Sequence, residues 1–181
     1  MDGTGSIGMS IEIDILNGDA SWPRVKSLFS LVWTPDVMGP LADVTWAHPD
    51  LRVILDADDG TTVCHVGLYF RDGIWNGRKV RLGGIGGVST HPAYRGKGYA
   101  SVALNAAIAT FRHHEATDFV VLVCGDHNIA FYRNRGWHVF NGKLLVEQQG
   151  ERIEFDIQTP MVFDLALRPR EGVIDLCGLP W

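Results

Sequence analysis

The sequence predicts a mixed α/β (α+β) fold in which an antiparallel meander is attached to one strand, helix, strand unit. Two observations support this prediction. Between residues 51 and 87 extended segments follow one another with only turns between them, and from residue 85 the pattern changes to strand, helix, strand. Strands joined by short turns pair antiparallel, whereas a helical crossover joins parallel strands, so we expect both kinds of pairing.

The N-terminal part of the chain predicts a strand, a helix and an irregular segment. Residues 9–16 alternate isoleucine with acidic residues, which is the period of a half-buried strand. Residues 22–32 place apolar side chains at helical spacing, and Ser21 before Pro23 is the expected N-terminal cap. Prolines and a glycine interrupt residues 34–50, so we expect a loop or a broken helix there.

The remaining chain predicts a hairpin, the crossover unit and a strand-rich tail. A turn at Asp58-Asp59-Gly60 divides the hairpin. The expected strands cover residues 51–56, 61–71, 78–87, 85–90, 119–124 and 137–140, with two or three more within 143–167, and the expected helices cover residues 98–112 and 128–134. Residues 168–181 are interpreted as an ordered or partner-bound extension.

Length and composition bound the class of protein. A chain of 181 residues suits one domain over residues 1–181, with residues 1–10 loose and 168–181 as the extension. Hydrophobic residues make up 46% and charged residues 20%, as in ordinary globular proteins. The longest apolar runs, such as Phe119 to Cys124, are too short to cross a bilayer, so no membrane partner is expected. Residues 1–10 show no secretory signal, which predicts a cytoplasmic protein.

Charge and metal-ligating residues exclude further classes. The net charge of −5 disfavours nucleic acid as a partner and mildly favours a cationic one. Three cysteines form no CxxC pair, which argues against a disulfide framework and a zinc site. Apart from His127, the histidines show no metal-ligand spacing. We predict no metal.

The strongest local signal is a glycine-rich turn that stands between a predicted strand and a predicted helix. Its sequence is Arg95-Gly96-Lys97-Gly98-Tyr99-Ala100. Glycines let several N–H groups converge, the helix adds the positive end of its dipole, and Arg95 and Lys97 add charge, so the turn suits a pyrophosphate. A plain strand-to-helix turn is the alternative. The turn lacks both the GxGxxG fingerprint and the GK[ST] of a P-loop.

Two patterns resemble the GNAT N-acetyltransferase superfamily. Arg95-x-x-Gly98-x-Ala100, preceded by Val88-Ser89-Thr90, resembles its acetyl-CoA loop, and residues 128–137 resemble its short helix and turn, with Asn128 leading and Tyr132 within. The resemblance implies a mostly antiparallel central sheet flanked by helices, with a cofactor cleft where the fourth and fifth strands splay apart. It also implies a dimer as one option for assembly, since dimers are frequent in the superfamily.

The resemblance assigns the residues that would bind acetyl-CoA. Main-chain groups of Val88, Ser89 and Thr90 would bind the pantetheine arm. The remaining cofactor-binding residues are Arg95, Gly96, Lys97, Gly98, Tyr99, Ala100 and Asn128. The glycine run 83–87 would permit a bulge before this strand end, or it merely weakens the strand.

The chemistry needs a proton donor for the departing thiolate and a donor for the oxyanion. A tyrosine is protonated at neutral pH, and by its position Tyr132 is similar to the family's general acid. The alternative is a core tyrosine with no catalytic role. The main-chain N–H near Val88 is the candidate oxyanion donor.

The end of the chain resembles the aminoglycoside 2′-N-acetyltransferases, through Val162-Phe163-Asp164-Leu165, Ile174-Asp175-Leu176-Cys177 and the final Trp181. The resemblance implies a substrate loop within residues 33–48. Asp36, Asp43 and the Trp181 carboxylate would then bind the ammonium groups of an aminoglycoside.

The sequence departs from this group at residue 86, where the group carries a glutamate and this chain has Gly86. Water, Asp126, His127 or the Trp181 carboxylate would then serve as the base, or the substrate differs; Asp126 is also a candidate for substrate binding. Solvated surface charges are the alternative for each acid. Acylation of another amine, such as a polyamine, a sugar amine or a protein N-terminus, and acyl-CoA binding without turnover remain the alternative functions.

Overall fold

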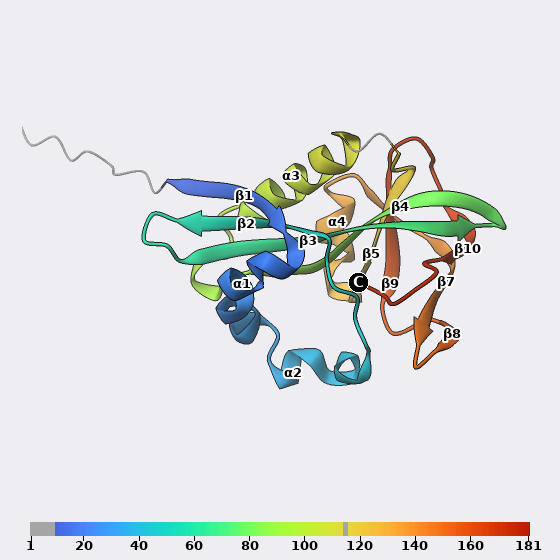
Figure 1. The fold of residues 1–181 in the computed structure, drawn as a ribbon, viewed down its shortest axis with the longest axis horizontal. Helices are drawn as coiled ribbons and strands as arrows, with labels where there is room; N and C mark the ends of the chain where they lie inside the picture. The colour runs from blue at the N-terminus through green and yellow to red at the C-terminus, as the bar shows by residue number, and fades with distance from the viewer. Residues whose placement is uncertain (1–9, 114–115) are drawn as a thin grey trace, which may run out of the picture.

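A single mixed sheet organises the chain. The computed structural model describes residues 10–113 and 116–181, and within them ten strands join one sheet (Figure 1). The strand order is β6-β9-β5-β4-β3-β10-β7-β8, and β2 pairs another part of β3 and carries β1 at its outer side. The predicted mixed fold is confirmed. Residues 1–9, including the start of the predicted first strand, lie outside the described residues.

The strands and helices follow the predicted order. The strands are β1 (Ile11–Asn17), β2 (Leu51–Ala57), β3 (Thr62–Trp75), β4 (Arg78–Thr90), β5 (Phe119–Cys124), β6 (Trp137–Val139), β7 (Asn141–Gln148), β8 (Glu151–Glu154), β9 (Thr159–Asp164) and β10 (Glu171–Asp175). The helices are α1 (Gly18–Val32), α2 (Pro35–Met38), α3 (Tyr99–His113) and α4 (Ile129–Arg133), with short 3-10 turns η1 (Gly39–Asp43), η2 (Pro92–Tyr94) and η3 (Asp126–Asn128).

Turn chemistry explains the long hairpin at the centre of the sheet. β3 and β4 are joined by Asn76 and Gly77, whose φ values of 49° and 78° are both positive. Two such residues form the turn whose twist matches antiparallel strands, and Asn-Gly is the preferred pair. β4 then pairs β5 in parallel across the α3 crossover.

Helix α1 begins earlier than the sequence predicted. Its cap is Asn17, whose side chain accepts a hydrogen bond from the N–H of Ala20. Ser21 lies inside the helix and donates to the main-chain oxygen of Asn17. The predicted cap at Ser21 was therefore wrong, because the strand β1 passes into the helix without the loop that a later start would need.

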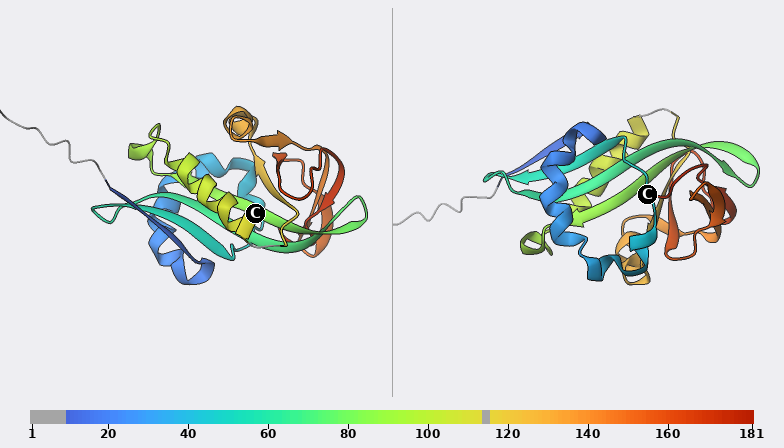
Figure 2. Two further views of the ribbon diagram at one scale, coloured as in Figure 1. Left: turned by 90° about the horizontal axis from the view of Figure 1, so that it is seen from above. Right: turned by 60° about the horizontal axis from the view of Figure 1, so that its bottom comes forward.

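Helices α1 and α3 cover different faces of the sheet (Figures 1 and 2). Side chains alternate along a strand, so Cys64 and Val66 pack into the core beneath α3 while His65 contacts Phe29 of α1. A second core gathers residues from β7, β9, β10 and the chain end around Tyr69 and Trp181. Both cores extend to β4, which therefore lies where the two halves of the molecule meet.

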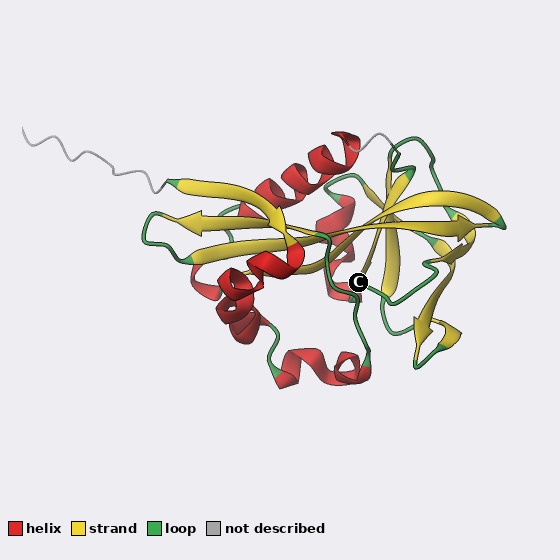
Figure 3. Ribbon diagram, in the orientation of Figure 1, coloured by secondary structure: helices red, strands yellow, loops and turns green. Residues whose placement is uncertain are grey.

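The extension 168–181 is part of the sheet. β10 inserts between β3 and β7, antiparallel to β3 and parallel to β7, and Figure 3 shows the loop that leads from it to the chain end. Nothing among the helices of the described residues is both long and apolar enough to span a membrane.

Candidate functional site

The strands β4 and β5 separate after a short parallel pairing. Their register covers three pairs, from Leu82 with Phe119 to Gly84 with Val121. Beyond this point β4 continues to Thr90 and β5 to Cys124, and each pairs only with its outer neighbour, β3 or β9. The described parts of these two strand ends therefore present unpaired sheet edges to one another, as the splay of the predicted fold requires.

A bulge lies in the separated part of β4. Gly86 faces Gly67 and Ser89 faces His65, so Gly87 and Val88 together stand opposite one residue of β3. Gly87 has a φ of 58°, a left-handed conformation that costs glycine little. Of the two interpretations of the glycine run, the bulge is the one that the register supports.

The glycine-rich turn leaves the first main-chain N–H groups of α3 without a capping side chain. Gly96 and Gly98 have φ values of 74° and 83°, and open space surrounds both. The first helical bond runs from the N–H of Val102 to the Gly98 oxygen, so the N–H groups of residues 99–101 precede the helical ladder, and a glycine at 98 offers no side chain to cap them. Converging free amides at a helix N-terminus are suited to an anion.

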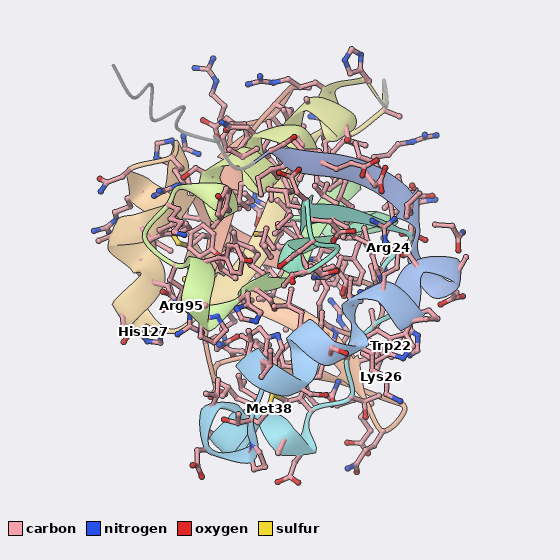
Figure 4. All side chains as sticks on the ribbon, turned by 90° about the vertical axis from the view of Figure 1, so that its left-hand side faces the viewer. Trp22, Arg24, Lys26, Met38, Arg95 and His127 are labelled. Carbon is pink, nitrogen blue, oxygen red and sulfur yellow. The ribbon has the colours of Figure 1, made fainter. Side chains whose placement is uncertain are left out.

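Two basic side chains flank this turn. Arg95 is exposed, and its Nε donates to the main-chain oxygen of Thr90 at 3.3 Å. Lys97 is also exposed and lies 5.1 Å from the ring centre of Tyr94. Figure 4 shows Arg95 on the same side of the molecule as His127, which belongs to the turn after β5. Positive charge therefore borders the uncapped amides, next to the end of β4.

Tyr132 lies in α4 and is 7% exposed. Burial, together with the thiol of Cys124, raises the pKa of its hydroxyl above the ordinary value of a tyrosine, and the thiol of Cys64 adds to the effect. Cys124 ends β5, while Cys64 stands opposite Thr90 at the end of β4. Tyr132 shares one core cluster with both cysteines, so it packs near the two separated strand ends, and its phenol stays protonated at neutral pH.

The Tyr132 hydroxyl has no hydrogen-bond partner within the described residues. It is also not one of their enclosed, unpartnered polar atoms, of which Asp56 Oδ1 is the single case. The hydroxyl therefore keeps access to solvent, although the ring packs against Phe131 and Trp137. A protonated hydroxyl with a free donor position is available to a ligand.

Trp181 is seated on glycines of β4. Its indole Nε1 donates to the main-chain oxygen of Val121 at 2.9 Å, and the residue is 4% exposed. A Cβ at Gly84 would lie 2.2 Å from Cε2 of the indole, and a Cβ at Gly86 would lie 2.7 Å from the main-chain carboxyl carbon of Trp181. The missing side chains at 84 and 86 thus make room for this residue where β4 leaves β5.

A cation and a stacked ring hold the chain end in this position. Arg71 donates from Nη1 to the main-chain oxygens of Leu176 and Leu179, at 3.3 Å and 2.7 Å, and its guanidinium lies 4.9 Å from the Trp181 ring centre. The Tyr69 ring stacks on the Trp181 ring, with 5.4 Å between the two ring centroids. Neither residue could be predicted from the sequence, because their partners lie about a hundred positions away in the chain.

The predicted acidic residues do not form one cluster. Asp36 is in the first turn of α2, Asp43 ends η1, and both are exposed. Asp126 is exposed and accepts a hydrogen bond from Thr159 Oγ1 at 2.8 Å. The loop after η1 does reach the chain end, because the N–H of Ala47 donates to the Pro180 oxygen. This contact links the predicted substrate loop to the segment that carries Trp181.

Further predicted residues lie at the end of β4 and in the turn after β5. Val88 and Thr90 are half-buried, and Asn128, the last residue of η3, is exposed.

Ser89 is buried, and its hydroxyl is part of a network that the sequence did not reveal. This network joins Trp33, Ser89, His65 and Arg52 at the bulge. An arginine and a histidine in otherwise apolar strands are the signal that could have identified it.

A metal-binding group of three His, Cys, Asp or Glu side chains does not occur among residues 10–113 and 116–181.

Comparisons with known proteins agree with this geometry. A GNAT family N-acetyltransferase from Escherichia coli (YhbS), solved in complex with CoA, is 16% identical with a TM-score of 0.63, over 97% of this chain and 93% of that one. A GNAT family acetyltransferase from Brucella melitensis, solved with acetyl-CoA, is 15% identical with a TM-score of 0.56, over 91% and 94%. Escherichia coli ElaA is 17% identical with a TM-score of 0.61, over 86% and 100%.

The sequence itself gives the assignment. Comparison with curated proteins yields no match. The model of the acetyltransferase (GNAT) family matches residues 22–137, which include the separated strands, the glycine-rich turn and Tyr132. This match covers more than half of the chain, and the chain therefore belongs to the GNAT family and is an acetyl-CoA-dependent N-acetyltransferase.

Proposed function

We propose that the chain transfers an acetyl group from acetyl-CoA to a primary amine of an aminoglycoside. The observation that carries the proposal is the position of Trp181. Its main-chain carboxyl carbon lies 2.7 Å from the place that a Cβ at Gly86 would take. An acidic group at this point would lie beside the bulge of β4. Gly86 is where the aminoglycoside 2′-N-acetyltransferases, which the chain end resembles, carry a glutamate.

The residues around the glycine-rich turn suit acetyl-CoA. The amides of residues 99–101 and the charges of Arg95 and Lys97 match a diphosphate, and the unpaired edge of β4 at 88–90 offers main-chain groups to an amide-containing arm. When bound, acetyl-CoA supplies a thioester whose acyl carbon an amine can attack. Asn128 is the remaining proposed cofactor-binding residue, at the start of the short helix that carries Tyr132.

Tyr132 is the proposed proton donor. The C–N bond forms as the C–S bond breaks, and the electron pair stays on sulfur, which needs a proton. The raised pKa of Tyr132 keeps its hydroxyl protonated across the working pH range, and this hydroxyl is solvent-accessible. Val88 N–H is the proposed donor to the acyl oxygen, on which negative charge develops.

The carboxylate of Trp181 is the proposed base. Gly86 has no side chain to compete for the space beside the main-chain carboxyl carbon of Trp181. A carboxylate can accept the proton that the attacking ammonium or amine loses. Asp126 and His127 are less suited, since Asp126 is bound to Thr159 and both side chains are exposed beyond the end of β5.

Acidic residues of α2 and η1, the two short helical elements after α1, are the proposed substrate-binding groups. Asp36 and Asp43 are exposed, and the loop that follows them is tied to the chain end through Ala47 and Pro180. An aminoglycoside carries several ammonium groups, which the net charge of −5 would attract. Separated carboxylates suit a long polycation better than a small monoamine, because each can bind a different ammonium group.

A thiol-release assay tests the proposal. Wild-type protein is given acetyl-CoA with a panel of aminoglycosides, polyamines and peptides, and we expect turnover with aminoglycosides that carry a 2′-amine. Silence with every aminoglycoside would reject the substrate, and turnover with polyamines alone would replace it. A variant with one glycine added after Trp181 moves the carboxylate but keeps the indole, so it should retain CoA binding and lose turnover at neutral pH; unchanged turnover would reject this base.

A further inference from the structure

Two chains of hydrogen bonds end on the same main-chain oxygen in the bulge of β4, that of Gly87. The main-chain oxygen of Gly87 lies 2.8 Å from Nδ1 of His65, and it accepts from the hydroxyl of Ser89 at 3.0 Å. His65 is 1% exposed, and Ser89 is equally buried. Two buried side chains therefore satisfy a single carbonyl in a part of the strand that has lost its register partner.

The outer members of both chains determine which way the protons point. Arg52 Nη1 lies 2.9 Å from Nε2 of His65, and an arginine can only donate, so Nε2 accepts and the ring proton sits on Nδ1, facing Gly87. Trp33 Nε1 likewise only donates, to Ser89 Oγ at 2.8 Å, which leaves the serine proton for the carbonyl. Both inner donors are thus aimed at the same oxygen.

Arg52 is itself held in place. Its Nε donates to the main-chain oxygen of Gly18 at 2.9 Å, and its guanidinium lies 5.3 Å from the ring centre of Trp22 and 5.9 Å from that of Phe29. Burial lowers the pKa of His65 to about 3, so the imidazole beside this cation is neutral at physiological pH. A neutral ring is what the donor and acceptor pattern requires.

The direction of the Gly87 carbonyl determines the direction of the next amide. A peptide unit is planar and trans, so the C=O of Gly87 and the N–H of Val88 point in opposite directions. The His65 ring leaves β3 on the face that α1 covers and packs against Phe29, so the carbonyl is turned toward this face on the β3 side. The Val88 N–H therefore points away from α1 and β3, toward the opposite face of the sheet on the side where β5 has separated from β4.

We propose that His65 and Ser89 are positioning residues for acetyl transfer: by holding the Gly87 carbonyl on the β3 side, they aim the Val88 N–H at the acyl oxygen in the opening between β4 and β5. The inference rests on the proposed function, because it needs a thioester at that place. Two hydrogen bonds to the carbonyl also polarise the peptide, which makes the N–H on the same unit a stronger donor. Arg52 and Trp33 act one step further back, by setting the proton positions.

Substitutions separate positioning from folding. Ser89→Ala removes one of the two bonds and leaves every main-chain group, so kcat should fall about three- to tenfold while the KM for acetyl-CoA stays within about threefold. His65→Leu removes the other bond, and His65→Asn should restore much of the rate, because its amide nitrogen can reach the place of Nδ1 and donate. The matched control is Thr110→Ala, which removes a part-buried hydroxyl bond to the main-chain oxygen of Ala106 within α3.

A spectroscopic readout tests the inference without turnover. In protein labelled with ¹⁵N-valine, acetyl-CoA should shift the Val88 amide resonance, and Ser89→Ala should reduce that shift while calorimetry gives an unchanged Kd for CoA. Wild-type rates in Ser89→Ala and His65→Leu, or a Val88 resonance that acetyl-CoA does not shift, would overturn the inference, as would an equal loss of rate in Thr110→Ala. If no amine is acetylated but the Val88 resonance still responds and depends on Ser89, the proposed substrate fails and the positioning role stands.

Discussion

Replacing Gly84 by alanine tests the seat of Trp181. The new Cβ would lie 2.2 Å from Cε2 and 2.5 Å from Nε1 of the indole, far inside van der Waals contact. The indole must shift, and it then strains or loses its bond to Val121 and its stacking on Tyr69.

Two estimates bound the loss in the free energy of unfolding that Gly84→Ala causes. Complete expulsion of a tryptophan side chain exposes about 200 Å², which at about 25 cal/mol per Å² is roughly 5 kcal/mol. Overpacking that the surroundings absorb costs about 1–3 kcal/mol. We therefore expect the free energy of unfolding to fall by about 3 kcal/mol and Tm by about 6–12 °C.

Urea denaturation of a double-mutant cycle with Gly84→Ala and Trp181→Ala measures the coupling free energy between the two positions. Trp181→Ala empties the space, so Gly84→Ala should cost at least about 1 kcal/mol less in that background. The matched control is Gly83→Ala, whose Cβ would lie 2.8 Å from the Phe111 ring on the other face; its cost should be the same with and without Trp181. A Gly84→Ala protein with wild-type stability, or equal coupling at both glycines, would refute this account of the chain end.

Three other predictions concern the proton donor, the turn and the buried histidine. Tyr132→Phe should lower kcat about 10²-fold or more with CoA affinity and Tm nearly unchanged, as the hydroxyl has no partner among the described residues; a wild-type rate would remove Tyr132 from the mechanism. Gly98→Ala, at a φ of 83°, should weaken CoA binding about tenfold by calorimetry, whereas Gly60→Ala, at 79° in the β2–β3 turn, carries the same strain and should leave binding intact. The pKa of His65 falls from 6.5 to about 3 on folding, so the unfolded chain binds the extra proton and stability drops as the pH falls from 6.5 toward 3. Between pH 7 and pH 5 wild type should lose about 2 kcal/mol more than His65→Asn in urea melts, and parallel losses would contradict the assignment.

Local chemistry made much of the fold predictable. The strand at Phe119–Cys124 has its predicted bounds, and α3 begins within one residue of the predicted start, because apolar periodicity and a glycine turn are properties of neighbouring residues. The turn before Tyr99, the short helix with Tyr132 and the broken segment after Trp33 were predictable for the same reason. Family membership follows from these local motifs, and the match to residues 22–137 agrees with them.

The site depended on contacts that no local pattern contains. From the sequence, the glycine run 83–87 either permits a bulge or merely weakens a strand. That Gly84 and Gly86 make room for Trp181, about a hundred positions later, appears only in the tertiary structure. The cap of α1 is Asn17 because β1 leads directly into the helix, a connection that the spacing of Ser21 and Pro23 did not show.

The sequence alone thus determined the elements and the residues that bring chemistry, since secondary structure and short motifs follow from neighbours in the chain. Tertiary structure decided how these residues are aimed. The carbonyl of Gly87 is oriented by His65 from the next strand and by Ser89, whose hydroxyl accepts a hydrogen bond from Trp33, the residue after the end of α1. The direction of one amide therefore depends on the packing of β3, β4 and the end of α1 together, and packing between distant segments is not encoded in any one of them.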